Sequence, residues 1–400
     1  MKALITGCGI GGPAIAMALR EVGIDAEIHE AYDAGAEGVG AFLNVASNGM
    51  AALRVLRLHH EVARAGIPTP DMVMWSGTGK RLGRVPNGMA LDDGTVSHTI
   101  LRSDLYRILR DAAAARGVPI AYGKRMVSFD DTGSQVVARY EDGTSATGDL
   151  LIAADGVHSR TRRLLDPEAP EPRYTGLYNC GGIIKDPNIT GEPGVYHMMF
   201  GRRAFFGYTV TGDGETWWFA NLPRALGDEP ADWRAVLEEA FADDAGIAAG
   251  LVRRADLGQV LPIHDLPPVP VWHRGRVVLT GDAAHATSPS SGQGASQAVE
   301  DAVVLARCLR DAARPPGGVR PVRERAARAG RAGGRLRQED QQQQGRRAGR
   351  PHLQGRAAAD HPEASGEPGV TRLDVPSPGQ PVTPTPRSRE AAAAARRGWG

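Results

Sequence analysis

The sequence predicts an α/β protein in which a parallel-sheet domain is interrupted by an inserted, mostly antiparallel β-sheet domain. Three observations predict this architecture. A strand at Lys2–Thr6 leads into a glycine-rich turn and a helix, and a late strand at Arg276–Thr280 leads into an acidic turn and a second glycine-rich loop. Between them, the middle of the chain consists of short β-like runs. Turns between strand and helix place ligands at the carboxyl ends of parallel strands.

The first turn has the pattern G-x-G-x-x-G, in the run Gly7–Gly12. The pattern alone is weak, but here it follows a strand and opens a helix that carries Ala14–Arg20. A second strand, Ala26–His29, then ends at Glu30, which is about the spacing at which an acid reaches a ribose. This order favours a Rossmann-like dinucleotide site over a glycine-rich turn of another α/β protein.

The chemistry of such a site assigns a role to each residue of the turn. A phosphorylated ribose would be repelled by the acid Glu30, which we expect to accept hydrogen bonds from the adenosine ribose hydroxyls. The helix N-terminus supplies positive potential for a pyrophosphate. We expect the turn to be shaped by Gly7, Gly9 and Gly12, and the pyrophosphate to face the N–H groups of Ile10 and Gly11.

The second element runs from the strand Arg276–Thr280 through Gly281–His285, Pro289 and Gly292–Gly294 to Glu300-Asp301. One dinucleotide motif does not distinguish NAD from FAD. A flavin is long and needs a second protein site for its ribityl chain and ring, and this distant carboxylate and glycine-rich loop provide one. The sequence therefore predicts FAD.

With both motifs, the chain resembles the class A flavoprotein monooxygenases, the family with the para-hydroxybenzoate hydroxylase fold. Leu151–Arg160 resembles the family's strand-ending Asp-Gly motif, with Ala154 where a glycine is usual. Arg102-Ser103-Asp104-Leu105 resembles its Arg-x-x-Leu at the start of a helix. The resemblance covers roughly residues 1–310.

The resemblance implies FAD as cofactor and NAD(P)H as a transient reductant, since no second G-x-G-x-x-G is present for nicotinamide. It implies that O₂ reacts through a C4a-hydroperoxyflavin to hydroxylate or epoxidise an aromatic or polyketide-like small molecule. A flavin reductase or dehydrogenase without oxygen insertion, and an FAD-binding protein impaired by its C-terminus, are the alternatives. A hydrolase is not indicated, because Ser288, Ser290 and Ser291 form no nucleophile elbow.

The resemblance also assigns site residues. Arg102 would reach the phosphates or ribityl chain, Val127 would contact adenine through its backbone, and Asp155 belongs to the Asp-Gly motif. Asp282 would accept hydrogen bonds from ribityl or pyrophosphate-side hydroxyls, unless it only caps the following turn. Near the ring we expect Gly292, Gly294 and Ala295, where helix N–H groups would stabilise negative charge, with Pro289 near the oxygen-reactive face.

His285 is expected to support this loop by hydrogen bonding rather than to act in acid–base catalysis. No catalytic side chain is assigned.

The chain divides into three parts on this interpretation. Residues 1–70, 101–170 and 271–312 form a discontinuous FAD-binding domain, and residues 71–100 and 171–270 form the substrate-binding sheet. Substrate contacts are expected from Phe42, Asn44, Met198, Phe200, Phe205, Tyr208, Trp217 and Phe219. Because side chains alternate along a strand, only half of the strand aromatics can face a substrate.

Residues 313–400 differ in composition. From Arg314 to Gly400 there are 17 arginines, a run Gln341–Gln344, one aromatic residue (Trp399) and no Phe, Tyr, Ile, Met or Lys. Such a segment cannot bury enough apolar surface to order itself, so disorder is predicted. We favour a reading-frame error in this GC-rich region over a basic tail for nucleic acid, because no aromatics interleave with the arginines.

Composition limits the remaining function classes. The formal net charge of +1 gives no reason to expect nucleic acid or membrane partners. No run of 18 apolar residues occurs, so no membrane span is expected. The three cysteines are scattered, without metal spacing or secretory context, which predicts no metal site and a cytoplasmic protein. We expect a monomer or homodimer that binds a small organic molecule.

Overall fold

The computed structural model describes residues 1–33, 42–186, 188–189 and 191–313. A six-stranded sheet has the order β18-β19-β12-β1-β2-β8. Its inner strands pair in parallel, and only the edge strand β18 is antiparallel. The strands are β1 (Lys2–Thr6), β2 (Asp25–His29), β8 (Ile120–Ala121), β12 (Leu150–Ala153), β18 (His273–Arg274) and β19 (Val277–Leu279). Ala3, Leu4, Ile5 and all of β12 are buried, as expected for a parallel sheet covered on both faces.

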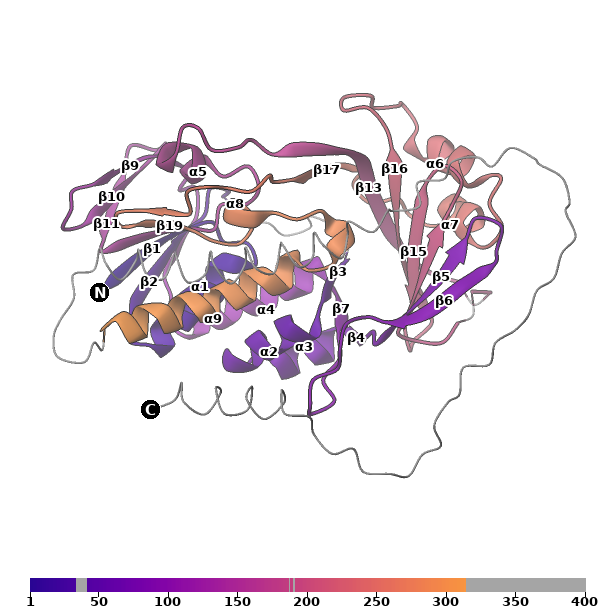
Figure 1. The fold of residues 1–400 in the computed structure, drawn as a ribbon, viewed down its shortest axis with the longest axis horizontal. Coiled ribbons are helices and arrows are strands. Elements are labelled where there is room, and N and C mark those ends of the chain that lie inside the picture. The colour runs from indigo at the N-terminus through magenta and orange to yellow at the C-terminus, as the bar shows by residue number, and fades with distance from the viewer. Residues whose placement is uncertain (34–41, 187, 190, 314–400) are drawn as a thin grey trace, which may run out of the picture. The chain divides into compact units, whose positions relative to one another are not determined.

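Helices cover this sheet (Figure 1). The largest apolar core joins β1 and β2 to the helices, and every residue of α1 from Gly12 to Leu19 is buried within it. α1 therefore lies between the sheet and α9, against which it packs. The helices of this layer are α1 (Gly11–Glu21), α2 (Ser47–Val55), α3 (His59–Ala65), α4 (Arg102–Ala115) and α9 (Gly294–Ala313).

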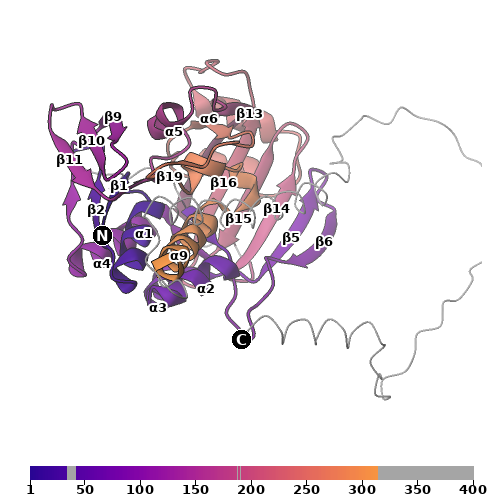
Figure 2. The same cartoon turned by 60° about the vertical axis from the view of Figure 1, so that its left-hand side comes forward.

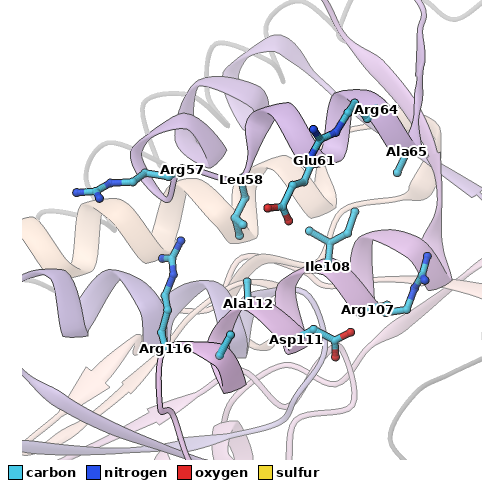
Figure 3. A pocket seen from close by; sticks show the side chains of 11 residues that line it. Arg57, Leu58, Glu61, Arg64, Ala65, Arg107, Ile108, Asp111, Ala112 and Arg116 are labelled. Atoms are coloured by element: carbon cyan, nitrogen blue, oxygen red, sulfur yellow. The ribbon is translucent and has the colours of Figure 1, made fainter.

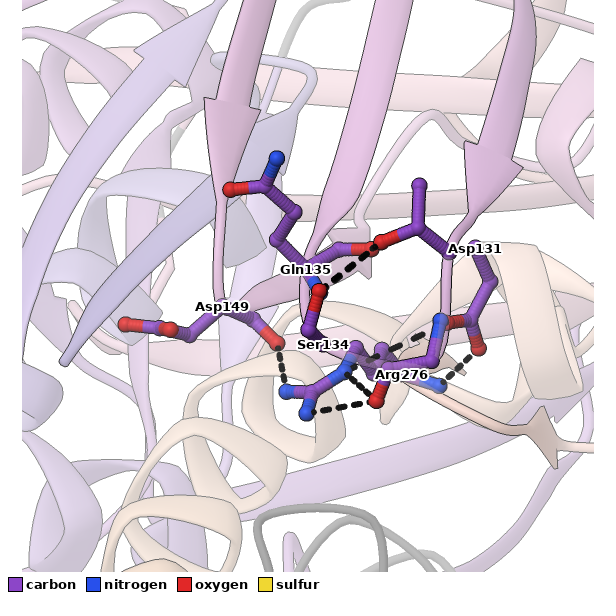
Figure 4. A network of polar contacts seen from close by, with 7 residues as sticks. Asp131, Ser134, Gln135, Asp149 and Arg276 are labelled. Atoms are coloured by element: carbon purple, nitrogen blue, oxygen red, sulfur yellow. Dashed lines mark hydrogen bonds and ion pairs between the residues drawn. The ribbon is translucent and has the colours of Figure 1, made fainter.

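A three-stranded antiparallel sheet packs beside the first, with α5 (Arg160–Leu165) near it. Its strands are β9 (Met126–Asp131), β10 (Val136–Tyr140) and β11 (Ser145–Gly148). Arg276, at the start of β19, is 7% exposed and fastens the β9–β10 turn (Figure 4). Its guanidinium donates to the carbonyl oxygens of Gly133 (3.0 and 3.1 Å) and Asp149 (2.9 Å), and its backbone N–H donates to Asp131 (2.9 Å).

A seven-stranded sheet has the order β17-β13-β16-β15-β14-β5-β6, and Figure 2 shows its strands from β13 to β6 in a row. α6 (Trp233–Phe241) and α7 (Ala248–Arg254) bury one face of it in a second core with Phe206 and Trp218. The strands are β5 (Asp71–Ser76), β6 (Arg81–Pro86), β13 (Arg173–Lys185), β14 (Val195–Phe200), β15 (Phe205–Val210), β16 (Glu215–Pro223) and β17 (Leu261–Asp265).

A short sheet connects the two larger ones in sequence and in space. It consists of β3 (Phe42–Val45), β7 (His98–Leu101) and β4 (Ile67–Pro68). On the side of the larger sheet, the hydroxyl of Thr99 donates to Tyr196 Oη at 2.9 Å, and the ring of Phe42 lies 5.7 Å from that of Trp217. Residues of this small sheet therefore contact the uncovered face of the seven-stranded sheet.

Most predicted elements are confirmed. The strands around Lys2, Ala26, Phe205 and Thr216 form, and so do the helices after Gly11 and from Arg102. The turn Glu141-Asp142-Gly143 predicts a hairpin of Val136–Tyr140 and Ser145–Leu150. β10 and β11 form this hairpin, with Gly143 at φ 80° in its turn. Its second strand was predicted to reach Leu150, which is wrong, because β11 ends at Gly148 and Leu150 begins β12 in another sheet.

The division into two domains stays a prediction, although the two large sheets draw their strands from the expected ranges. The predicted disorder of residues 313–400 lies outside the described residues, apart from the last residue of α9. None of the helices in the described residues is both long and apolar enough to span a bilayer.

Candidate functional site

The Gly7–Gly12 turn contains two kinds of glycine. A Cβ at Gly7 would lie 2.5 Å from the carbonyl oxygen of Ala154, and one at Gly12 would lie 2.0 Å from that of Gly7. The fold itself therefore requires these two glycines, and Gly7 also has φ 94°. At Gly9, by contrast, φ is not positive and no described atom lies within 4 Å of a Cβ. The described fold therefore does not require glycine at position 9. A ligand that passes close to this turn would require it, because a side chain there would block its approach.

This arrangement fits the pyrophosphate of the predicted cofactor. α1 begins at Gly11, within the turn, and no side chain of the described residues caps its N-terminus. The first-turn N–H groups of a helix have no intrahelical acceptors, so they can donate to an anion. Ile10 and Gly11 are only partly buried, which leaves their backbone accessible.

Glu30 lies at the end of β2, next to this turn, and is 6% exposed. Its carboxylate accepts hydrogen bonds from the backbone N–H groups of Cys8 (2.6 Å) and Tyr32 (3.0 Å). The two N–H groups fix the carboxylate beside the glycine turn. Each carboxylate oxygen can accept a further hydrogen bond, so the geometry is compatible with the predicted ribose contact.

Asp282 is the clearest sign of a second polar site. It begins the short helix α8 (Asp282–His285), and Gly281 before it has φ 55°. The side chain is exposed to solvent, yet the protein surrounds it closely enough that desolvation raises the pKa of Asp282. Both observations are explained if the carboxylate lines a recess. No other described residue donates a hydrogen bond to this carboxylate.

Two further predicted residues lie near this carboxylate. Asp282 Oδ1 is 3.9 Å from where a Cβ on Gly294 would stand, at the first turn of α9. Burial lowers the pKa of Arg102, and the charge of Asp282 opposes this effect. The structure thus brings together the start of α4, the start of α8 and the N-terminus of α9. A polar cofactor with hydroxyl and phosphate groups fits this donor and acceptor set.

The turn that carries Asp282 is held by Asp301 on α9. The carboxylate of Asp301 accepts hydrogen bonds from His285 Nε2 (2.6 Å), the Gly281 N–H (2.9 Å) and Thr280 Oγ1 (3.3 Å). His285 is 4% exposed. The prediction that His285 supports the loop is therefore confirmed, and an acid–base role is not indicated for so buried a ring.

Arg162 holds the same turn from the other side. Its side chain is 1% exposed, and it donates to the carbonyl oxygens of Ala283 (3.1 Å) and Val157 (2.8 Å). It links α5 to α8. Desolvation lowers the pKa of Arg162 while the charge of Asp155 raises it. Neither Arg162 nor Asp301 was assigned a role from the sequence. Asp301 could have been noticed because the second glycine-rich element ends at the acidic pair Glu300-Asp301.

Ser296 and Asn48 hold the first turns of α9 against the start of α2. Ser296 Oγ accepts from the Ala46 N–H at 2.9 Å, and Asn48 Nδ2 donates to Glu300 at 2.9 Å. Gly292, at φ 60°, ends the single 3₁₀ turn Pro289–Ser291. Asn44 Nδ2 lies 3.5 Å from the carbonyl oxygen of Gly292. Asn44, predicted to contact substrate, therefore also contacts the loop Pro289–Gly294.

Asp155 and Val127 are in different situations. Both carboxylate oxygens of Asp155 are engaged within α5, accepting from Ser159 Oγ at 2.6 Å and from the backbone and hydroxyl of Thr161 at 3.0 and 2.8 Å. Val127 lies at a β-bulge, between Met126 and Ser128, and has no partner in the register with β10. Val127 is an exposed residue, and contacts of both residues with FAD stay predictions.

The predicted substrate residues divide between the two faces of the large sheet. Ring centroids of Phe42 and Phe219 are 6.0 Å apart, and those of Phe219 and Phe205 are 5.8 Å apart. Trp217, Met198 and Phe200 share this face by register. Tyr208 does not: it stacks on His197 at 4.5 Å and packs against the α6–α7 core. The alternation along β15 separates Tyr208 from the other candidates.

A groove of about 770 Å³ lies elsewhere, between α3 and α4 (Figure 3). Its floor is apolar and its rim is charged, and none of the predicted site residues lines it. The lining residues are Arg57, Leu58, Glu61, Arg64, Ala65, Arg107, Ile108, Asp111, Ala112, Ala115 and Arg116. Within the part of the chain that the structure describes, no group of three His, Cys, Asp or Glu side chains is placed to hold a metal ion.

Comparisons with known proteins match this arrangement. A family model described as "FAD binding domain" matches residues 1–318. The chain is 35% identical over 314 residues to an aurachin C monooxygenase/isomerase of Stigmatella aurantiaca, covering 77% of this chain and 80% of that protein. It is 31% identical over 316 residues to an FAD-dependent urate hydroxylase of Klebsiella pneumoniae, covering 78% and 82%.

A solved structure is similar over the same range. The structure of Klebsiella pneumoniae HpxO complexed with FAD and uric acid has a TM-score of 0.72 and 29% identity. The superposition covers 83% of this chain and 83% of that one.

Proposed function

This chain belongs to the class A FAD-dependent monooxygenases, and from that premise we propose how its residues hold the cofactor and on what kind of molecule it acts. The enzyme is an FAD-dependent monooxygenase that hydroxylates or epoxidises a small organic substrate. Its proposed reductant is NAD(P)H and its proposed oxidant is O₂. The proposed substrate is an aromatic or polyketide-like compound, because related enzymes are named for urate, 6-hydroxynicotinate and aurachin C.

One observation carries the assignment of the site. The carboxylate of Asp282 is open to solvent, yet the surrounding protein raises its pKa by desolvation, and it lies next to Arg102 and the first turn of α9. An unpaired carboxylate in such a recess costs free energy unless hydroxyl or N–H groups donate to it. A ribityl chain supplies such hydroxyls. We therefore assign the acceptor role to Asp282.

The other residues divide the remaining tasks. Gly9 allows close approach to the turn, Ile10 and Gly11 present N–H groups to the pyrophosphate, and Glu30 accepts from the adenosine ribose. Arg102 neutralises phosphate charge through its planar guanidinium. Val127, at the β-bulge, would contact adenine through its backbone, and Asp155 shapes the segment leading to Arg162.

FAD, when bound, accepts a hydride from NAD(P)H and activates O₂, and the chemistry is the cofactor's own. The chain supplies position and electrostatics. The helix N-terminus at Gly294 and Ala295 would offer backbone N–H groups to negative charge on a bound flavin, and Asp301 holds the turn that carries Asp282. Pro289 lies exposed before Gly292 and would limit access to the ring.

The remaining proposals concern the setting of the enzyme. A cytoplasmic location is supported by the three unpaired cysteines, two of them buried. A monomer or a homodimer is proposed as its assembly.

The test follows the flavin spectrum of the purified protein. We expect flavin absorbance that bleaches on anaerobic addition of NADH or NADPH and returns in air, with one atom of ¹⁸O₂ found in the product. Stoichiometric hydrogen peroxide and no ¹⁸O in product across a substrate screen would replace the proposal with a reductase or oxidase.

A further inference from the structure

The face of the large sheet that meets Phe42 carries no formal charge over three neighbouring rows of residues. The register defines the rows, and we call these residues together the Phe219 floor. All residues of the Phe219 floor lie in the described part of the chain, and none of these residues is Asp, Glu, Lys, Arg or His. They are Ile183, Trp217, Thr209, Tyr196 and Met72; Gly181, Phe219, Gly207, Met198 and Met74; and Asn179, Asn221, Phe205, Phe200 and Ser76.

The middle row makes this floor flat. Gly181 and Gly207 flank Phe219 on the two neighbouring strands. A Cβ at Gly207 would lie 2.4 Å from the Phe219 ring, so the ring lies over the glycine. Phe219 and Met198 are only partly buried and belong to none of the apolar cores. A partly exposed ring over glycine offers a flat surface for stacking, and Phe42 meets this ring in an edge contact, with ring centroids 6.0 Å apart.

The outer row ends in a pair of asparagines with a fixed orientation. Asn179 Nδ2 donates to the Ala220 carbonyl oxygen at 3.3 Å and to Asn221 Oδ1 at 2.8 Å. Because a backbone carbonyl can only accept, the atom of Asn179 that faces the Ala220 carbonyl must be its amide nitrogen. The atom of Asn221 that faces this nitrogen must then be its amide oxygen. The Nδ2 of Asn221 is left without a protein acceptor in the described residues, although the residue is 6% exposed. This nitrogen keeps some contact with solvent on the Phe42 side of the sheet, so a ligand oxygen that replaces water there can accept its hydrogen bond.

From these observations we propose that the substrate is an uncharged, flat and largely apolar ring compound, whose oxygen accepts a hydrogen bond from Asn221. The proposal rests on the proposed function, since it specifies the substrate of the same site. An anionic ring compound would have to leave water for a floor that holds no cation in its three rows, and Lys185 in the next row lies opposite the acid Glu215. An unpaired charge is costly to bury. The selectivity expected here therefore differs from that suggested by the uric acid in the related structure.

The experiment compares probes of one skeleton and different charge on the FAD-loaded protein. 2-Naphthol is uncharged at pH 7 and 2-naphthoate is an anion, and uric acid and naphthalene complete the set. Binding is followed by the change in flavin absorbance and by tryptophan fluorescence. We expect 2-naphthol to bind at least tenfold more tightly than 2-naphthoate or uric acid.

Variants separate the hydrogen bond from the apolar surface. Asn221→Ala is expected to weaken 2-naphthol binding by about fivefold to tenfold, the loss of one hydrogen bond, and to leave naphthalene binding unchanged. Tyr208→Phe, on the opposite face of the sheet, is the matched control and should change neither. The comparison of 2-naphthol with 2-naphthoate in the unaltered protein is independent of whether Asn221→Ala folds.

Tighter or equal binding of either anion, no binding of the uncharged probes, or 2-naphthol binding unaffected by Asn221→Ala would overturn the proposal. Failure of the proposed function looks different: the probe selectivity would stand, but product would carry no oxygen from O₂. A protein that inserts oxygen yet prefers anions would refute this inference alone.

Discussion

The carboxylate of Asp301 accepts a hydrogen bond from His285 Nε2 at 2.6 Å, and it accepts another from the backbone N–H of Gly281 at 2.9 Å. One side chain on α9 thus holds both ends of the turn that presents Asp282. Because α9 also begins at Gly294, near the carboxylate of Asp282, the helix and the turn cannot move independently.

Asp301→Asn is expected to weaken FAD binding about tenfold. An amide oxygen accepts weaker hydrogen bonds than a carboxylate, and a charge-assisted hydrogen bond contributes about 1.5–3 kcal/mol. The dissociation constant of FAD, measured by recovery of flavin fluorescence, checks this. Asp311→Asn on the same helix, where the carboxylate pairs only with exposed Arg310, is the control and should leave the constant unchanged. Equal affinities in the two variants would contradict a positioning role for Asp301.

Gly9→Ala and Gly12→Ala should fail in different ways. Gly9→Ala meets no described atom within 4 Å, so the thermal midpoint of the FAD-free protein should be unchanged while FAD affinity falls. Gly12→Ala would place a methyl group 2.0 Å from the carbonyl oxygen of Gly7, so the FAD-free protein itself should be destabilised. Calorimetry without FAD, followed by FAD titration, separates the two. Normal FAD affinity in Gly9→Ala would exclude close approach of the cofactor there.

Much of the fold was predictable because local patterns determine it. The glycine turn, the parallel strands and the α4 helix combine strong hydrophobic patterns with turn residues at fixed spacing. The position of Asp282 and Gly294 near each other was predictable because strand, turn and helix follow in one short stretch of sequence.

The rest depends on contacts between distant segments. Arg162 and Ala283 are separated by 121 positions, and nothing in the local sequence marks Arg162 as buried. The side of the sheet on which Tyr208 lies depends on register across four strands, which aromatic content alone does not determine. β11 ends at Gly148, where the pair Gly148-Asp149 marks a break, and the prediction carried the strand past this signal to Leu150.

Arg276→Leu should lower the free energy of unfolding by about 3 kcal/mol. The buried guanidinium is the donor for the carbonyl oxygens of Gly133 and Asp149 (Figure 4), and a leucine would leave both without it. Arg274→Leu, exposed on β18, is the control and should change stability by less than about 0.5 kcal/mol. Chemical denaturation of the two variants measures the difference. A similar small loss in both would mean that the β9–β10 turn does not depend on Arg276.

Asp282→Asn should make the FAD-free protein more stable at pH 7 and make it bind FAD less tightly. Desolvation raises the pKa of Asp282 in the folded state, so the folded protein keeps a proton that the unfolded chain releases. Stability is therefore lost as pH rises from the ordinary aspartate pKa through the raised one, and the penalty is complete above both.

Replacing Asp282 with asparagine removes that penalty, so the two thermal midpoints should converge in acid, where the aspartate is protonated in both states. Thermal unfolding between pH 3 and pH 8, with exposed Asp92→Asn as the control variant, tests the relation. If the variant were less stable than the wild type at pH 7, or bound FAD as tightly, Asp282 would have a structural role in the turn. A carboxylate whose role is to bind a ligand should show this combination of gained stability and lost affinity. The free-energy cost of its desolvation is offset only when the ligand donates a hydrogen bond to it.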